Sequence, residues 1–174
     1  GPYDTPRYDP WVQVLNSLGY ATLKVNFRSS GGYGDFLEND GDKAWGTKVI
    51  DDITDGVNWI ISNKTVNKDK ICVIGASFGG YATMMSLIRE PELYKCGVPM
   101  MGVYDLSIMF TRDRADASRG KARYLEDYRK DVIGHGDEEH MLIHSPLNNV
   151  IKLEDPVLFI HGAEDKRVPI IHME

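Results

Sequence analysis

Hydrophobic positions along the chain follow two spacings in turn, and this alternation predicts strands separated by helices. Apolar residues at helical spacing predict a helix over residues 11–18, which Gly19 would close as a C-cap, and another over 49–61. Short runs rich in strand-forming residues predict buried strands at 21–27, 71–74, 97–101 and 156–160.

A third helix is predicted over residues 81–88, directly after a predicted strand and before Pro91, which would stop it. Strands that alternate with single helices imply right-handed crossovers and a mostly parallel sheet with helices on both faces. We therefore predict an α/β fold that forms one domain, or part of one, over residues 1–174. A polar insertion at about 105–155 would carry one or two helices, such as 121–129, over the carboxyl ends of the strands.

Composition narrows the class of protein. The 174 residues are 42% hydrophobic, which is enough for a sizeable core, and the net charge of -6 comes with scattered basic residues. We therefore expect no nucleic-acid partner. No apolar run approaches the roughly 18 residues that span a bilayer, and the chain does not open with the order of a signal peptide. A soluble domain without a membrane segment is predicted, and the compartment stays open between cytoplasmic and periplasmic or secreted.

Two cysteines, Cys72 and Cys96, are too few for a disulfide framework and lack the spacing of a metal site. Both fall at or in predicted core strands, so inert buried thiols are the default expectation. A disulfide between them is the alternative if the two strands are neighbours. No metal or organic cofactor is expected.

The run Gly75-Ala76-Ser77-Phe78-Gly79 matches the G-x-S-x-G pattern between a predicted strand and a predicted helix. This context is typical of a nucleophile elbow, a sharp turn that lifts a serine hydroxyl above the sheet edge. Because the turn holds the serine at strained backbone angles with close neighbours, the flanking glycines are expected to be needed for their lack of a Cβ atom. Ser77 is therefore the candidate nucleophile, and the backbone N–H of Phe78 is the candidate oxyanion donor.

A serine hydroxyl needs a base to take its proton and an acid to orient that base. In the α/β-hydrolase fold the acid and then the histidine follow the serine along the chain. Asp165 is the candidate acid because it comes directly after the predicted strand 156–160, at the same sheet edge as Ser77. Glu164 is the adjacent alternative, and the other interpretation of Asp165 is a turn residue that binds its own backbone.

No histidine of the chain is well placed to act as the base. The base normally follows one more helix and one more strand, which need about 20 residues, and only nine follow Asp165. His172 is too close to Asp165 to return over the sheet, and His161 abuts the strand end and would shape the turn. The others precede the acid in the polar insertion: His135, His140 and His144.

Five segments occur in an order and at intervals that carry a family resemblance. They are Val25-Asn26-Phe27-Arg28-Ser29-Ser30-Gly31-Gly32-Tyr33-Gly34, Asp51-Asp52, Gly75-Ala76-Ser77-Phe78-Gly79-Gly80-Tyr81, Ser145-Pro146 and His161-Gly162-Ala163-Glu164-Asp165-Lys166-Arg167-Val168-Pro169. Together they resemble the catalytic domain of prolyl oligopeptidase family serine peptidases, in the branch of acylaminoacyl and dipeptidyl peptidases. The resemblance covers nearly the whole chain and is more specific than the elbow, which esterases and lipases share.

The resemblance implies an α/β-hydrolase fold with Ser77 as the nucleophile and Asp165 as the acid of the triad. Members of this branch carry His-Gly-Gly-Pro before the first helix, and the N–H of the second glycine is the other oxyanion donor. Gly1, followed by Pro2, is similar to that second glycine, although a Gly-Pro pair left by tag cleavage would look the same.

The resemblance also assigns roles around the nucleophile. An apolar pocket would bind the residue before the scissile bond, and core packing is the alternative role of Met100. In this family the glycine-rich loop supports the active site through hydrogen bonds, so Arg28 and Tyr33 are interpreted as scaffold. The residues implied to line the pocket are Phe78, Met100, Val103 and Val168.

The sequence departs from the family in two respects. Full members have an amino-terminal β-propeller that restricts entry to oligopeptides, and neither a propeller segment nor the triad histidine is present. We therefore expect a fragment, truncated at both ends, whose histidine lies beyond residue 174 and which is inactive by itself.

The function predicted from these observations is that of a serine peptidase, which hydrolyses short peptides through an acyl-enzyme on Ser77. The expected partners are an oligopeptide substrate and the missing β-propeller of the parent chain. A carboxylesterase or lipase-like hydrolase on the same fold is the alternative, and a non-catalytic relative used for binding is the third hypothesis.

Overall fold

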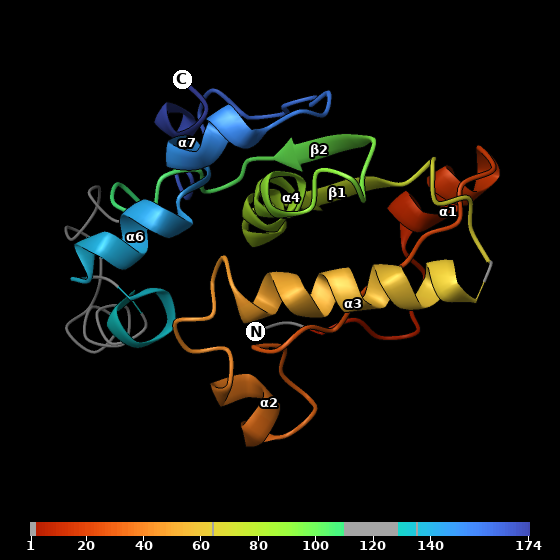
Figure 1. Ribbon diagram of the computed structural model, residues 1–174, viewed down its shortest axis with the longest axis horizontal. Helices are drawn as coiled ribbons and strands as arrows, with labels where there is room; N and C mark the ends of the chain where they lie inside the picture. Colours follow the sequence, from red (N-terminus) through yellow and green to blue (C-terminus); the bar gives the residue numbers. More distant parts are fainter. Residues whose placement is uncertain (1–2, 64, 110–128, 135) are drawn as a thin grey trace.

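The computed structural model describes residues 3–63, 65–109, 129–134 and 136–174 of the chain (Figure 1). At its centre a strand, a helix and a second strand follow one another, as in a parallel α/β unit. The main elements, in chain order, are α1 (Pro10–Ser17), α2 (Asp35–Asn39), α3 (Lys48–Ser62), β1 (Cys72–Ala76), α4 (Phe78–Arg89), β2 (Cys96–Met100), α6 (Glu138–His144) and α7 (Pro146–Asn149). Short turns of other helix types are η1 (Arg129–Ile133), η2 (Val150–Lys152) and η3 (Ile170–His172).

The helices expected from hydrophobic periodicity are confirmed. α1 matches the prediction of 11–18 within one residue at each end, and Gly19 follows it with a φ of 88°, as a C-cap glycine does. α3 and α4 contain the predicted ranges 49–61 and 81–88, and α4 starts earlier because it begins at the elbow. The helix predicted for 121–129 lies, apart from its last residue, outside the described residues. Within the described ranges, no helix combines the length and apolarity needed to cross a membrane.

β1 and β2 form a parallel pair in which Ala76 lies opposite Met100. Residues 156–160 continue the sheet on the other side of β2 through isolated bridges, one of which joins Ile160 to Met100. The strands predicted at these three places are therefore confirmed as parallel neighbours, although the third forms only bridges. Since all three segments run in the same direction, their carboxyl ends meet at one edge of the sheet.

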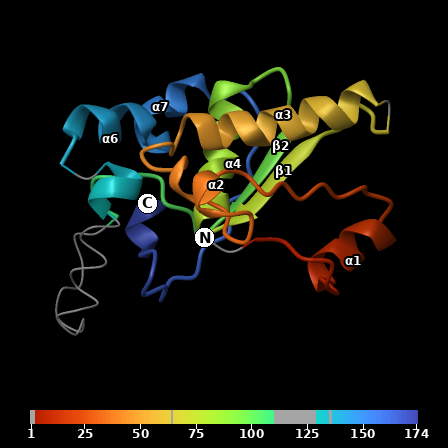
Figure 2. The same ribbon diagram turned by 90° about the horizontal axis from the view of Figure 1, so that it is seen from below.

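The prediction of a strand over residues 21–27 is wrong. This segment is extended, but it makes no ladder with either strand of the sheet (Figure 2). Its side chains pack instead on α3, where Val25 and Leu23 approach Gly56. A strand forms where a neighbouring strand satisfies its backbone hydrogen bonds, and the described part of the chain supplies no such neighbour here.

α4 covers one face of the sheet, and α3 packs alongside α4. Every residue of α4 from Gly80 to Ile88 is buried, so this helix forms the centre of the molecule. One core cluster joins residues of α3 and α4 to residues that follow α4 and β2, and it contains Val57, Met84, Leu87, Tyr94 and Tyr104. The other includes Trp45, Ile50, Tyr81, Ala82, Met85, Val103, Leu106, Ile133, Met141 and Val168.

The opposite face of the sheet is open among the described residues. Ile74, Leu158 and Ile160 are 43%, 62% and 44% exposed, and α1 buries none of its own residues. The predicted helical cover is therefore present on one face only in the described part of the chain.

A disulfide joins Cys72 and Cys96 across the first residues of β1 and β2. The expectation of inert buried thiols is therefore wrong. The parallel register sets the two cysteines directly opposite each other, with their Cα atoms 4.7 Å apart, and this separation is within the range of natural disulfides.

Candidate active site

Ser77 lies in the turn between β1 and α4, at the carboxyl edge of the sheet. Its φ of 57° and ψ of -117° fall outside the regions that residues with a Cβ atom normally occupy, so its backbone is strained. Its N–H donates to the carbonyl of Met100 at 2.9 Å, and its carbonyl accepts from Gly80 and Tyr81 at 3.0 and 3.2 Å. The predicted strand–turn–helix geometry of the elbow is confirmed, while the catalytic role of Ser77 stays a prediction.

Close packing at the elbow requires glycine at two positions. A Cβ atom on Gly75 would overlap the carbonyl group of Gly79. A Cβ atom on Gly80 would lie 2.7 Å from the Cα atom of Gly102 and 2.8 Å from the carbonyl oxygen of Met100. A Cβ atom on Gly79 would meet nothing within 4 Å, so the expectation that both flanking glycines are needed is correct for Gly75 and wrong for Gly79.

Phe78 is the first residue of α4, so its N–H has no acceptor within the helix. The positive end of the helix dipole adds to the attraction of this N–H for a negatively charged oxygen. Its ring packs against the rings of Trp45 at 4.5 Å, Phe27 at 5.3 Å and Tyr81 at 5.8 Å between centroids. Trp45 has no local sequence motif that would identify it as part of the site, and only the fold brings it there.

Asp165 lies in the loop after residues 156–160. Its Oδ1 accepts from the N–H groups of Arg167 at 2.8 Å and Val168 at 2.9 Å, and its own N–H donates to the carbonyl of Gly162 at 3.1 Å. The bond from Val168, helped by that from Arg167 and opposed by slight burial, lowers the pKa of Asp165. The carboxylate is therefore ionised at neutral pH. Among the described residues its Oδ2 has no hydrogen-bond partner, so a turn role and a triad role are compatible.

The sheet register brings Ser77 and the Asp165 loop to the same edge. Ala76, Met100 and Ile160 form one row across the three parallel segments. Ser77 is the next residue after that row on one outer segment, and the loop that carries Asp165 begins one residue after the row on the other. Because neighbouring strands are about 4.8 Å apart, the two outer segments are about 10 Å apart at this edge.

Neither histidine near this edge is free to serve Ser77. The Nε2 atom of His161 lies 2.8 Å from the carbonyl oxygen of Val168, to which it donates in the tautomer protonated there. The prediction that His161 shapes the turn is confirmed. His172 is buried in η3, where its Nδ1 lies 3.4 and 3.5 Å from the N–H groups of Tyr104 and Asp105. Burial lowers the pKa of His172, so its ring is neutral at pH 7.

The remaining described histidines, His140 and His144, pack on each other one turn apart on α6, with ring centroids 4.5 Å apart. Burial lowers the pKa of both. His135 lies outside the described residues. In the ranges that the structure describes, no group of three or more His, Cys, Asp or Glu side chains is arranged to hold a metal ion.

The structure brings together three of the four predicted pocket residues. Val103 and Val168 belong to one buried cluster, and Phe78 packs against that cluster. Met100 is half-buried on the open face of the sheet and is not part of that cluster. The second predicted oxyanion donor, Gly1, lies outside the described residues.

Sequence comparison finds relatives that match nearly the whole chain. The sequence model of the prolyl oligopeptidase family matches residues 6–174. The chain is 32% identical to dipeptidyl aminopeptidase BIII of Pseudoxanthomonas mexicana over 173 residues, which are 97% of this chain and 24% of that protein. It is 33% identical to dipeptidyl peptidase family member 6 of Caenorhabditis elegans over 169 residues, 92% of this chain and 22% of that one. It thus spans less than a quarter of the length of these relatives.

Solved structures agree with the sequence match. An acylaminoacyl peptidase in complex with Z-Gly-Gly-Phe-chloromethyl ketone superposes with a TM-score of 0.70 at 27% identity, over 84% of this chain and 23% of that one. A puromycin hydrolase superposes with a TM-score of 0.71 at 26% identity, over 85% and 22%. The predicted α/β-hydrolase fold is confirmed. Because sequence and fold agree over this extent, the chain belongs to the prolyl oligopeptidase family.

Proposed function

We propose that this chain carries the nucleophile and the acid of a serine peptidase that hydrolyses short peptides through an acyl-enzyme on Ser77. The observation that carries the proposal is the strained backbone of Ser77 at the start of α4, with the Asp165 loop at the same sheet edge. Strain of this kind costs of order 1–3 kcal/mol, and strained residues cluster at active sites, ligand clamps and switch regions. Membership of a peptidase family favours peptide amides over esters as substrates.

The proposed reaction has two halves. The Ser77 oxygen attacks the carbonyl carbon of the scissile amide, its proton passes to a histidine, and the carbonyl oxygen becomes negative beside the Phe78 N–H. The intermediate then breaks its carbon–nitrogen bond, and the histidine gives the proton to the leaving amine. Water repeats the sequence on the ester to release the acid and restore Ser77.

The histidine is proposed to come from beyond residue 174 of a longer polypeptide. The engagement of His161 and His172 in other contacts supports this proposal. The Oδ2 of Asp165, which has no hydrogen-bond partner within the described ranges, also supports it, since a triad acid needs one oxygen for the Nδ1–H of the base. A second oxyanion donor at Gly1 and an amino-terminal β-propeller that admits oligopeptides belong to the same proposal.

The substrate is proposed to carry an apolar side chain before the scissile bond. Support comes from the apolar cluster of Val103 and Val168 next to Phe78. Met100 lies outside that cluster, so its place in the proposed pocket rests on the family resemblance alone. One solved relative, the acylaminoacyl peptidase, is complexed with a ligand whose name ends in Phe-chloromethyl ketone. An apolar pocket of this kind discriminates by only about 1–3 kcal/mol per methylene, so the preference is broad.

The compartment is proposed to be oxidising, in line with the periplasmic or secreted alternative. The disulfide between Cys72 and Cys96 supports this location, since structural disulfides are rare in reducing compartments. Thiol titration of the protein isolated under non-reducing conditions tests it. Two free thiols per chain would favour a cytoplasmic location.

The central test compares the full native polypeptide with the 174-residue chain. The native polypeptide is expected to react with a fluorophosphonate probe and to cleave aminoacyl amides, and Ser77→Ala should abolish both. The 174-residue chain should show neither at an enzyme-like rate. If the native polypeptide hydrolyses aryl esters but not amides, the result supports the esterase hypothesis instead. If the fluorophosphonate probe does not label Ser77 at all, the result supports a non-catalytic binding role.

A further inference from the structure

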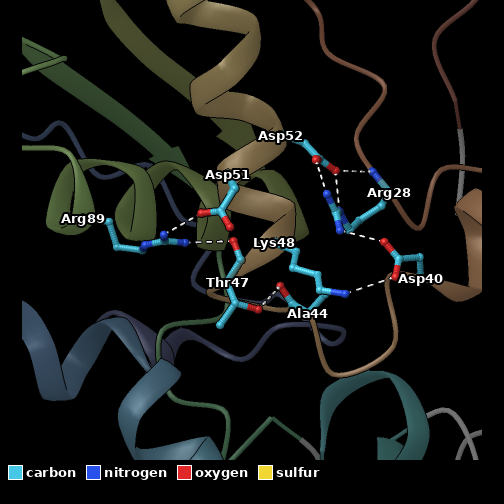
Figure 3. A network of polar contacts seen from close by, with 8 residues as sticks. All are labelled: Arg28, Asp40, Ala44, Thr47, Lys48, Asp51, Asp52 and Arg89. Carbon is cyan, nitrogen blue, oxygen red and sulfur yellow. Dashed lines mark hydrogen bonds and ion pairs between the residues drawn. The ribbon is translucent and has the colours of Figure 1, made fainter.

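Two adjacent carboxylates on α3 each hold an arginine from a different part of the chain (Figure 3). Arg28 comes from the loop after residues 21–27, and its fork grips Asp52 with Nη2 to Oδ1 at 2.6 Å and Nε to Oδ2 at 2.7 Å. The backbone N–H of Arg28 adds a third bond to Asp52 at 2.9 Å. This backbone bond means that the pair holds the main chain of the loop as well as the side chain.

The second arginine, Arg89, is the last residue of α4. Its Nη2 donates to Oδ1 of Asp51 at 2.6 Å, and its Nη1 donates to the carbonyl groups of Gly46 and Thr47 at 3.0 and 2.8 Å. The guanidinium therefore ties α4 to the chain segment that precedes α3. Figure 3 shows both arginines converging on the start of α3 from different directions.

Next to each anchored backbone position is an aromatic residue whose ring packs on Phe78. Phe27 directly precedes Arg28, and Trp45 directly precedes Gly46. The two rings lie 5.3 and 4.5 Å from the ring of Phe78. Each ring that packs on Phe78 therefore belongs to a residue that directly precedes a residue bound in the charged network at α3.

The Arg28–Asp52 pair is the stronger of the two anchors. Only about a fifth of each side chain is exposed, at 21% and 22%. Partial burial opposes ionisation of Asp52, but the hydrogen bonds from Arg28 outweigh it and lower the pKa of the carboxyl. Hydrogen bonding to Asp52 also raises the pKa of Arg28. A bidentate, partly desolvated pair of this kind is more rigid than an exposed ion pair.

We propose that Arg28 and Arg89, anchored on Asp52 and Asp51, are positioning residues that hold the Phe27 and Trp45 rings against Phe78 and so fix the oxyanion donor beside Ser77. This inference rests on the proposed peptidase function. Neither arginine touches the substrate. They act through Phe78, whose displacement by a fraction of an ångström would misplace a donor that is used only in the transition state.

The test uses the full native polypeptide with Arg28→Met, Arg28→Lys and a matched control, Lys48→Met. Lys48 belongs to the same network through Asp40, a carboxylate that also accepts from Nη1 of Arg28 at 2.7 Å, but the Lys48 side chain is 57% exposed. Arg28→Met is expected to lower kcat about tenfold with little change in KM, because loosening a donor costs less than the 10²–10³-fold of deleting one. Arg28→Lys should be intermediate, and Lys48→Met should match the wild type.

Inhibitor binding separates positioning from general damage. A peptidyl boronic acid, which forms a tetrahedral adduct on serine, should bind Arg28→Met about tenfold more weakly, in step with kcat. The amine product of the cleavage, which carries no oxygen from the scissile carbonyl group, should bind as tightly as before. The inference is overturned if Arg28→Met equals Lys48→Met in kcat at equal folded fraction, or if both inhibitors weaken alike.

A readout without activity separates this inference from the proposed function. Hydrogen exchange at the amides of Gly80 and Tyr81, which bind the Ser77 carbonyl, reports on the elbow directly. Faster exchange in Arg28→Met than in Lys48→Met supports positioning even if the wild type proves inactive, and equal exchange refutes it. If Arg28→Met does not fold, Asp52→Asn replaces it, since it keeps the side-chain volume.

Discussion

Ser77 and Asp165, the proposed nucleophile and the proposed acid, are held in place by different means. Ser77 follows β1 and opens α4, whose residues from Gly80 to Ile88 are all buried, so the whole core fixes its strained backbone. Asp165 lies in a loop near the surface, where bonds to its own neighbours, Arg167 and Val168, set the carboxylate. Substitutions in the core beneath the elbow should therefore cost stability, whereas substitutions in the Asp165 loop should cost only catalysis.

The largest expected effect is Asp165→Asn in the full native polypeptide. Asparagine keeps an oxygen for the N–H groups of Arg167 and Val168 but cannot hold a histidine in the correct tautomer. We expect kcat to fall about 10⁴-fold while the melting temperature changes little. Steady-state kinetics and a thermal melt on the same sample measure both. A large loss of stability would show that the acid loop is part of the core after all.

The disulfide at the start of β1, at the end of the strand away from the elbow, gives the next effect. It closes a loop with a sequence separation of 24 between Cys72 and Cys96. Removing such a cross-link by Cys72→Ser with Cys96→Ser should lower the free energy of unfolding by about 3 kcal/mol. Urea denaturation with and without reductant measures it, and the double variant should no longer respond to reductant. An unchanged midpoint in the double variant would exclude a structural role for the disulfide.

A pair of glycine substitutions tests the packing directly under Ser77. A Cβ atom on Gly80 would meet the backbone of Gly102 and Met100, which cannot move aside, so Gly80→Ala should destabilise by about 2 kcal/mol. Gly79→Ala is the matched control, because its Cβ atom would meet nothing and alanine favours a helix by about 0.5–1 kcal/mol. Denaturant unfolding curves of both variants measure the two changes in stability. Equal changes would show that Gly80 is packed no more tightly than Gly79.

The smallest expected effect is the contribution of His172, in η3 after the Asp165 loop, to the pH dependence of stability. Burial lowers the pKa of His172 below its ordinary 6.5, so the unfolded chain binds its proton more readily than the folded chain. Stability is therefore complete above about pH 6.5 and decreases as the pH falls below it. His172→Gln should flatten the curve between pH 7.5 and 5.5 only in part, because His140 and His144 titrate in the same direction. A curve that stays as steep would contradict the assignment to His172.

The sequence could predict the parts of the site that depend on local backbone chemistry. The elbow at Ser77 and the three long helices follow from glycine positions and apolar periodicity, and the structure agrees with them. The strand expected at 21–27 fails for the opposite reason. Its composition favours a strand, but a strand also needs a neighbour, which composition does not report.

The amino-acid sequence alone identified the family, the candidate nucleophile and the candidate acid, because short contiguous motifs carry all three. The folded structure was needed to show that Cys72 pairs with Cys96, that Trp45 packs on Phe78 and that Met100 lies outside the apolar cluster. Those outcomes depend on which distant segments become neighbours. Register and packing choose such neighbours through the free energy of the whole core, and no local pattern along the chain encodes them.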